Sequence, residues 1–169
     1  MDTRPGITRT LALYRRFSAL PCGSWLFSRA VCWKAPCFAS IAPRIVQLEP
    51  NRCEVVIRQR RRVQNHLGTV HAIALCNAAE LAGGLMLEAT LPASLRWIPK
   101  GMKVAYRKKA RGTLRVAATP RTEIVETDTP HTLPVEVAAI DAEGQRVFEA
   151  VIDMWLSPRP VNVTGHATR

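Results

Sequence analysis

The feature that most constrains this chain is one long segment, residues 70–91, that is apolar on almost every helical face. Its only carboxylates are Glu80 and Glu88, and a helix of this kind must be buried over most of its surface. The segment is long enough to span a bilayer, but Glu80 would then lie near the midplane at a cost of ~3 kcal/mol. A buried helix of a soluble domain is therefore the preferred interpretation.

Runs of β-forming residues flank this helix on both sides. Two precede it, at residues 44–49 and 53–59, joined by a turn at Pro50-Asn51-Arg52. Four follow it, at residues 102–110, 113–122, 133–141 and 146–156, with hairpin-like turns expected at Arg111-Gly112 and Glu143-Gly144. Only a strongly curved antiparallel sheet can bury one helix on most faces. The pattern therefore predicts an α+β domain whose sheet wraps around one long central helix.

The chain before this domain has a different composition. Residues 4–33 carry five arginines and many apolar side chains but no acidic residue. They predict two short helices that pack on the domain, with Leu11, Tyr14, Phe17 and Trp25 turned inward. The rival interpretation is contact with a membrane surface through the arginines. We thus expect an N-terminal helical arm at 1–43, the main domain at 44–157 and a flexible tail at 158–169.

The net charge limits the classes of partner. With 24 Lys and Arg against 13 Asp and Glu, the chain carries +11 and attracts polyanions such as nucleic acid, anionic lipid or the phosphates of coenzyme A. Aromatic residues make up only 6%, and no stacking platform for nucleic acid is visible. The five cysteines have no C-x-x-C spacing, so neither a disulfide framework nor a metal site is predicted. A reducing cytoplasm fits best, and no cofactor is expected.

A polar loop stands directly before the long helix. It reads Asn65-His66-Leu67-Gly68-Thr69-Val70-His71, and Glu80 follows His71 by nine residues. Thr69 is the expected N-cap of the helix. In spacing and residue type, this segment resembles the hotdog-fold acyl-CoA thioesterases of the phenylacetic-acid-degradation type, which carry Asn-x-x-Gly-x-x-His-Gly-Gly and then a helical Asp or Glu nine positions after that His.

The resemblance covers roughly residues 44–156. Within that superfamily, residues 65–80, 96–102 and 108–112 are similar to a bacterial subfamily with an added N-terminal helical arm. The resemblance implies the hotdog fold and a fatty-acyl thioester substrate. It also departs from the family at one place: the Gly-Gly after the motif His is here Ala72-Ile73. In the family the first of these supplies a backbone N–H to the thioester oxygen. Ala72 keeps that N–H, while its methyl group and Ile73 narrow the approach.

Hydrolysis of a thioester needs a base or a nucleophile, and hydrogen-bond donors aimed at the developing oxyanion. A helix N-terminus supplies unpaired N–H groups and a positive dipole end, which places Ala72 and Ile73 to polarise a carbonyl, with Ala72 N–H as the expected oxyanion donor. Glu80 lies ~180° around the helix from His71, so within one subunit it points away from the first turn. The resemblance implies dimers with the two long helices side by side, in which Glu80 of one subunit can serve the helix N-terminus of the other. The expected assembly is therefore a homodimer or homotetramer, with Glu80 as base. Asn65 would hold water or substrate, and His71 would fix the loop.

Further residues are expected to contact the substrate. His66, Gly68, Thr69 and Ile73 surround the helix N-terminus in the sequence and are assigned to the acyl-thioester end, whether coenzyme A or an acyl-carrier protein holds it. As the resemblance implies, the coenzyme A nucleotide crosses the sheet edge, where its phosphates would meet the basic side chains Lys100, Lys103, Arg107, Lys108, Lys109 and Arg111.

Two alternatives stay open. Hotdog 3-hydroxyacyl dehydratases carry a His fourteen residues before a helical Glu, as His66 and Glu80 are here, but the prolines of their motif are missing. A non-catalytic acyl-thioester-binding protein is the other alternative, and the narrowed site at Ala72-Ile73 favours it. Glu80 could also be a buried structural carboxylate that is bonded to Asn77 or to a backbone N–H. Gly83-Gly84 in mid-helix costs ~1 kcal/mol per glycine, which indicates close approach of a ligand or simply of a packed neighbour.

Overall fold

A computed structural model describes residues 7–160 of the chain. The helices are α1 (Arg9–Ser18), α2 (Gly23–Lys34) and α3 (Ala72–Thr90), with short 3-10 helices η1 (Pro36–Ile41) and η2 (Arg61–Val63). The strands are β1 (Arg44–Glu49), β2 (Arg52–Arg58), β3 (Leu95–Tyr106), β4 (Thr113–Pro120), β5 (His131–Ile140) and β6 (Arg146–Pro158). Most of the expected C-terminal tail lies outside the described residues.

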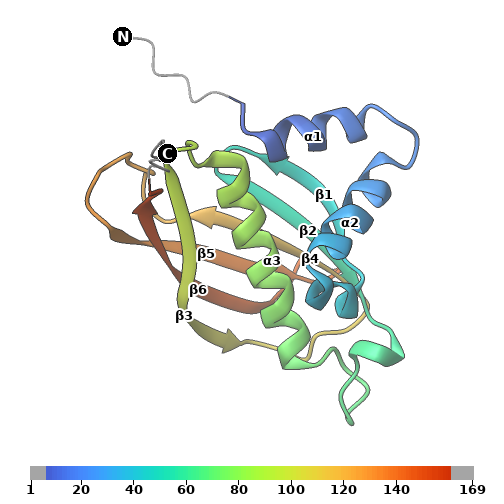
Figure 1. The fold of residues 1–169 in the computed structure, drawn as a ribbon. Helices are drawn as coiled ribbons and strands as arrows, with labels where there is room; N and C mark the ends of the chain where they lie inside the picture. The colour runs from blue at the N-terminus through green and yellow to red at the C-terminus, as the bar shows by residue number, and fades with distance from the viewer. Residues whose placement is uncertain (1–6, 161–169) are drawn as a thin grey trace, which may run out of the picture.

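One antiparallel sheet contains all six strands, in the order β1-β2-β4-β5-β6-β3. Figure 1 shows α3 across one face of this curved sheet. The sheet buries alternate side chains against α3, as Cys53, Val55 and Ile57 of β2 illustrate with at most 1% exposure. The predicted hotdog architecture is confirmed, and the sheet order leaves β3 and β1 as its two edges.

The small side chains of α3 let the helix approach the sheet closely. Ala78, Ala79 and Ala82 are fully buried, and a methyl group at Gly83 would lie 3.2 Å from Met154 Cε. α3 is long and apolar enough to cross a membrane, the only such helix in the described part of the chain. In this structure the sheet covers the apolar face of α3, and the buried side chains of the helix belong to the same hydrophobic core as those of the strands.

The N-terminal arm belongs to the same core. Figure 1 shows α1 and α2 on the β1 side of α3, and α2 packs on β1 while α1 reaches α3. Leu11 is buried, and Tyr14 and Phe17 pack against the core as expected. The inward orientation predicted for Trp25 is wrong, because its side chain is 55% exposed and Phe27 takes the buried position on α2 instead.

Two local expectations also need correction. The strand expected at 102–110 begins at Leu95 and ends at Tyr106, because β6 continues to Pro158 and pairs with these earlier residues. A turn does occur near Gly112, whose φ is +69°, but it does not join a hairpin. β3 pairs with β6, whereas β4 pairs with β2 and β5, so the connection crosses from one side of the sheet to the other.

Candidate functional site

The loop before α3 is held rigidly by its own hydrogen bonds. The Oδ1 atom of Asn65 accepts from the backbone N–H groups of Leu67 (3.0 Å) and Thr69 (3.1 Å), and its Nδ2 donates to Thr69 Oγ1 (3.0 Å). Gly68 has a φ of +67°, a conformation that glycine adopts without strain. Asn65 therefore spends most of its hydrogen-bonding capacity on shaping the loop, so it has little left for a water or substrate.

His71, and not Thr69, is the N-cap of α3. The Nδ1 atom of His71 accepts a hydrogen bond from the backbone N–H of Ile73 at 3.1 Å. The backbone N–H of His71 donates to the backbone oxygen of Val63 at 2.8 Å. Thr69 is buried and bonded to Asn65, which removes it from the cap position. The prediction that His71 fixes this region agrees with these contacts, and its ring occupies one of the free donors of the helix.

The remaining donor at this helix end is Ala72. Among the hydrogen bonds of the described residues, none engages the Ala72 N–H. No acidic side chain stands in the first turn of α3, so the positive end of the helix dipole is not neutralised locally. The side chains of Ile73 and His66 are exposed. This arrangement leaves one backbone donor that can polarise a carbonyl oxygen.

Glu80 lies on another side of α3. It belongs to a stripe of residues spaced by four, Cys76, Glu80, Gly84 and Glu88, which faces strand β3. Cys76 Sγ and Tyr106 OH are 3.4 Å apart, and this hydrogen bond together with burial raises the pKa of Tyr106 to about 12. Glu80 itself is exposed in the protomer and does not meet the residues around Ala72 there. The expectation that Asn77 bonds Glu80 is not met, because Asn77 Nδ2 donates to Cys37 O and Ser40 Oγ.

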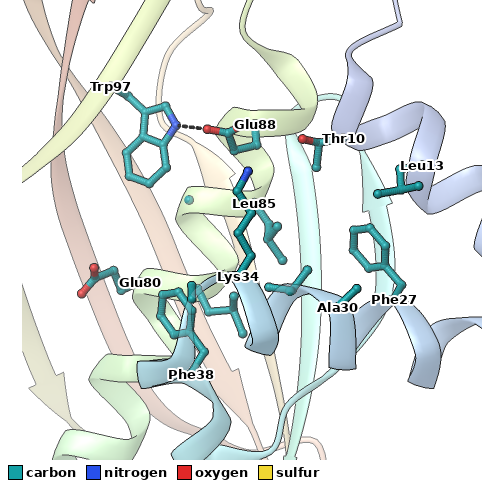
Figure 2. Close-up of a pocket in the computed structure, with 14 residues that line it drawn as sticks. Thr10, Leu13, Phe27, Ala30, Lys34, Phe38, Glu80, Leu85, Glu88 and Trp97 are labelled. Carbon is teal, nitrogen blue, oxygen red and sulfur yellow. Dashed lines mark hydrogen bonds between the residues drawn. The ribbon is translucent and has the colours of Figure 1, made fainter.

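An apolar groove of about 370 Å³ runs over α3 beside Glu80. Its floor is formed by Leu81, Leu85 and the backbone at Gly84. The arm supplies one wall, and Trp97 of β3 the other (Figure 2). The charged lining residues are Lys34, Glu80 and Glu88. We call this cavity the arm groove.

The motif from Asn65 to Glu80 does not predict the arm groove. The sequence signal for it is the Gly83-Gly84 pair, because glycines in mid-helix indicate close approach of a ligand or a packed neighbour. A methyl group at Gly84 would lie 2.8 Å from Trp97 Cη2, so the glycine is needed where the indole ring stacks on the helix. The indole N–H donates to Glu88 Oε1 at 3.0 Å, which fixes the ring, as Figure 2 shows.

The basic residues assigned to phosphate binding are spread over β3 and the turn after it. Lys100 Nζ lies 3.5 Å from the centre of a Trp155 ring. Lys103 lines a groove on the sheet with Arg146 and Glu149, while Arg107 pairs with Glu149 at 2.7 Å. Hydrogen bonds from Arg146 and Arg107 hold the pKa of the Glu149 carboxyl below its usual range. The side chains of Lys108, Lys109 and Arg111 are exposed.

Comparisons with known proteins agree with this architecture. A family model described as a domain of unknown function, DUF4442, matches residues 23–156. The structural-genomics protein APC5556 is 42% identical, with a TM-score of 0.75 over 89% of this chain and 98% of that one. A search of the curated proteins finds no match.

More distant solved structures share the fold. A probable thioesterase from Pseudomonas aeruginosa is 23% identical, with a TM-score of 0.65 over 83% of this chain and 97% of that one. The PaaI protein of the phenylacetic acid degradation operon of E. coli is 13% identical, with a TM-score of 0.63 over 78% and 91% of the two chains. The family match spans most of the chain and the structural matches give its architecture. The chain therefore belongs to the DUF4442 family, and it has the hotdog fold that it shares with these thioesterase-family structures.

Proposed function

We propose that this protein hydrolyses an acyl thioester carried by coenzyme A or an acyl-carrier protein. The observation that carries the proposal is the free Ala72 N–H at the uncompensated N-terminus of α3, combined with a carboxylate, Glu80, exposed on the side of the helix that faces β3. In the described chain β3 pairs only with β6, so its other edge is open. A second subunit that pairs there brings its Glu80 toward the first subunit's helix N-terminus.

The proposed reaction uses one water and no cofactor. Glu80 takes a proton from the water, and the oxygen attacks the thioester carbonyl carbon. The carbonyl oxygen becomes an oxyanion and accepts a hydrogen bond from Ala72 N–H, helped by the helix dipole. The tetrahedral intermediate then breaks its C–S bond. The proton on Glu80 passes to the leaving thiolate, which gives a free acid and a thiol.

Non-catalytic binding of the acyl thioester is the second candidate, and two observations favour it. Asn65 is engaged by Leu67 and Thr69, so it has little capacity to position a water. The exposed Ile73 side chain stands where the resembling enzymes have glycine. In this alternative the arm groove holds the acyl group, and the thioester is not hydrolysed.

The test is thioester turnover by the purified protein against a panel of acyl-CoA substrates. Glu80→Gln keeps the side-chain shape and removes the base, so turnover should fall by a factor of ~10² to 10⁴ while substrate still binds. Glu143→Gln is the matched control, because Glu143 lies in the β5–β6 turn and should leave turnover unchanged.

Three results would redirect the proposal. Full activity of Glu80→Gln would contradict the assigned base. Absence of hydrolysis by the wild type, with acyl-CoA still bound, would select the binding protein. Hydration of an enoyl thioester that His66→Ala abolishes would identify a dehydratase instead.

A further inference from the structure

The arm groove shares only Glu80 with the thioesterase motif, and the rest of its lining is mostly apolar. Its deepest lining residues, Leu81 and Phe27, are 1% exposed, and Leu85 is 8% exposed. The polar side chains of the lining are Thr10, Lys34, Glu80 and Glu88. A ligand that enters this groove must therefore be apolar along its length, because a buried polar group would find few partners.

We propose that the arm groove binds the acyl chain of the substrate, and that the arm and Trp97 together favour acyl groups of medium length or longer over short ones. This inference deepens the proposed hydrolase and rests on it only for the link to turnover. The acyl chain enters beside Glu80, where the thioester meets the helix N-terminus of the second subunit, and it runs along α3 toward Glu88. These two residues are two helical turns apart, about 12 Å along the axis.

The two walls of the groove come from different parts of the chain. α2 and η1 contribute Ala30, Val31 and Phe38, and α1 contributes Leu13. On the opposite side, Trp97 is fixed by its hydrogen bond to Glu88 and by its contact with Gly84. Both walls are thus built before any ligand arrives, and an aliphatic chain gains contact on two sides without ordering new side chains.

This geometry predicts how kcat/KM depends on the length of the acyl chain. Each methylene buried in an apolar site strengthens binding up to about fourfold. We therefore expect kcat/KM to rise along the series from butyryl-CoA to decanoyl-CoA and to level off once the groove is full. Palmitoyl-CoA should gain nothing over lauroyl-CoA, because the additional carbons extend beyond the end of the groove.

The test fills the groove from the arm side. Ala30 is exposed and lines the groove, so Ala30→Phe places a ring in the cavity without disturbing the core. Ala12→Phe is the matched control on α1, where the side chain is exposed and lies outside the groove. Binding of the fluorescent fatty acid cis-parinaric acid is measured directly, and the acyl-CoA chain-length profile is measured in parallel.

Ala30→Phe should weaken cis-parinaric acid binding at least tenfold and abolish the preference for decanoyl-CoA over butyryl-CoA, while Ala12→Phe behaves as wild type. If the two variants bind the probe equally and share one chain-length profile, the assignment of the groove is wrong, even where hydrolysis itself is observed. If no thioester is cleaved but Ala30→Phe alone loses the probe, the groove assignment stands and the hydrolase proposal fails.

A second variant acts from the other wall and covers the case in which Ala30→Phe does not fold. Gly84→Ala pushes against the indole ring of Trp97 and should displace it into the groove. We expect a shifted tryptophan emission and a severalfold loss of probe affinity, with the circular dichroism spectrum unchanged. Unaltered probe affinity together with a displaced ring would contradict the proposal.

Discussion

In the first turn of α3, one backbone N–H is used to cap the helix and another is free to bind a ligand. The first four N–H groups of a helix have no partner within it. Here the ring of His71 satisfies Ile73 N–H, and Ala72 N–H is left without a partner among the described residues. A histidine at this position therefore stabilises the helix end and, in the proposed mechanism, leaves a single oriented donor for the substrate.

Substitution of His71 separates capping from catalysis. Loss of a cap costs about 1 kcal/mol, so His71→Ala should lower the free energy of unfolding by that amount in urea titrations. Asparagine is itself a good cap, so His71→Asn should restore most of the stability and most of the thioester turnover. A stable His71→Asn protein without turnover would show that the imidazole takes part in the reaction.

Two elements, α3 and β3, decide how the site can be completed. β3 is a twelve-residue edge strand whose outer edge has no partner in the described chain. Long open edges pair readily with another strand. The stripe of Cys76, Glu80, Gly84 and Glu88 on α3 faces this strand, so a partner that pairs there also comes close to Glu80. One symmetric contact would then build two equivalent sites.

A complementation experiment tests this shared site. Proline at the first helical position keeps the helix and removes only its N–H, and His71 has the extended conformation that a following proline requires (φ −64°, ψ 141°). Ala72→Pro should therefore fold normally and lose turnover by a factor of ~10² or more. A refolded equal mixture with Glu80→Gln should recover about a quarter of wild-type turnover, since half of the dimers contain one intact site.

Light scattering on the wild type at micromolar concentration should show two or four chains. A well-behaved monomer that hydrolyses thioesters, or a mixture with no recovery, would contradict the cross-subunit mechanism. Ala72→Gly retains the N–H and serves as the control for the effect of changing the side chain alone.

At the scale of the whole molecule, the arm and the sheet form one folding unit. Leu11, Phe27 and Ile41 of the arm are at most 2% exposed and join the same cluster as the sheet residues. The ring of Phe27 meets that of Tyr14 edge-on, with centroids 5.2 Å apart. The arm is thus a packed part of the domain. Trp25 and Trp33, which lie on α2 like Phe27, face solvent.

Paired substitutions on α2 test this unity. Phe27→Ala should lower the free energy of unfolding by about 3–5 kcal/mol, because a fully buried ring leaves a cavity between the arm and the sheet. Trp25→Ala, at an exposed position, should change it by no more than ~0.5 kcal/mol. Chemical denaturation followed by circular dichroism and tryptophan fluorescence should give one coincident transition for each protein. Separate transitions would show that the arm unfolds independently.

The local pattern of residues was sufficient for much of this molecule. The unbroken apolar segment 70–91 predicted the buried helix, alternation in residues 53–59 predicted the face of β2, and the polar loop with Gly68 located the start of the helix. These features follow from side-chain periodicity and turn chemistry, which act over a few residues. The motif from Asn65 to Glu80 likewise indicated the family fold.

Tertiary structure alone decided the rest. Because β3 pairs with β6, the strand begins at Leu95 and not at residue 102. Whether Trp25 or Phe27 is the buried ring depends on where α2 meets β1. The arm groove brings Leu13 and Trp97 to opposite sides of one helix, although they are far apart along the chain. Contacts between distant segments leave no period in the sequence, because each is set by how whole elements pack to exclude water.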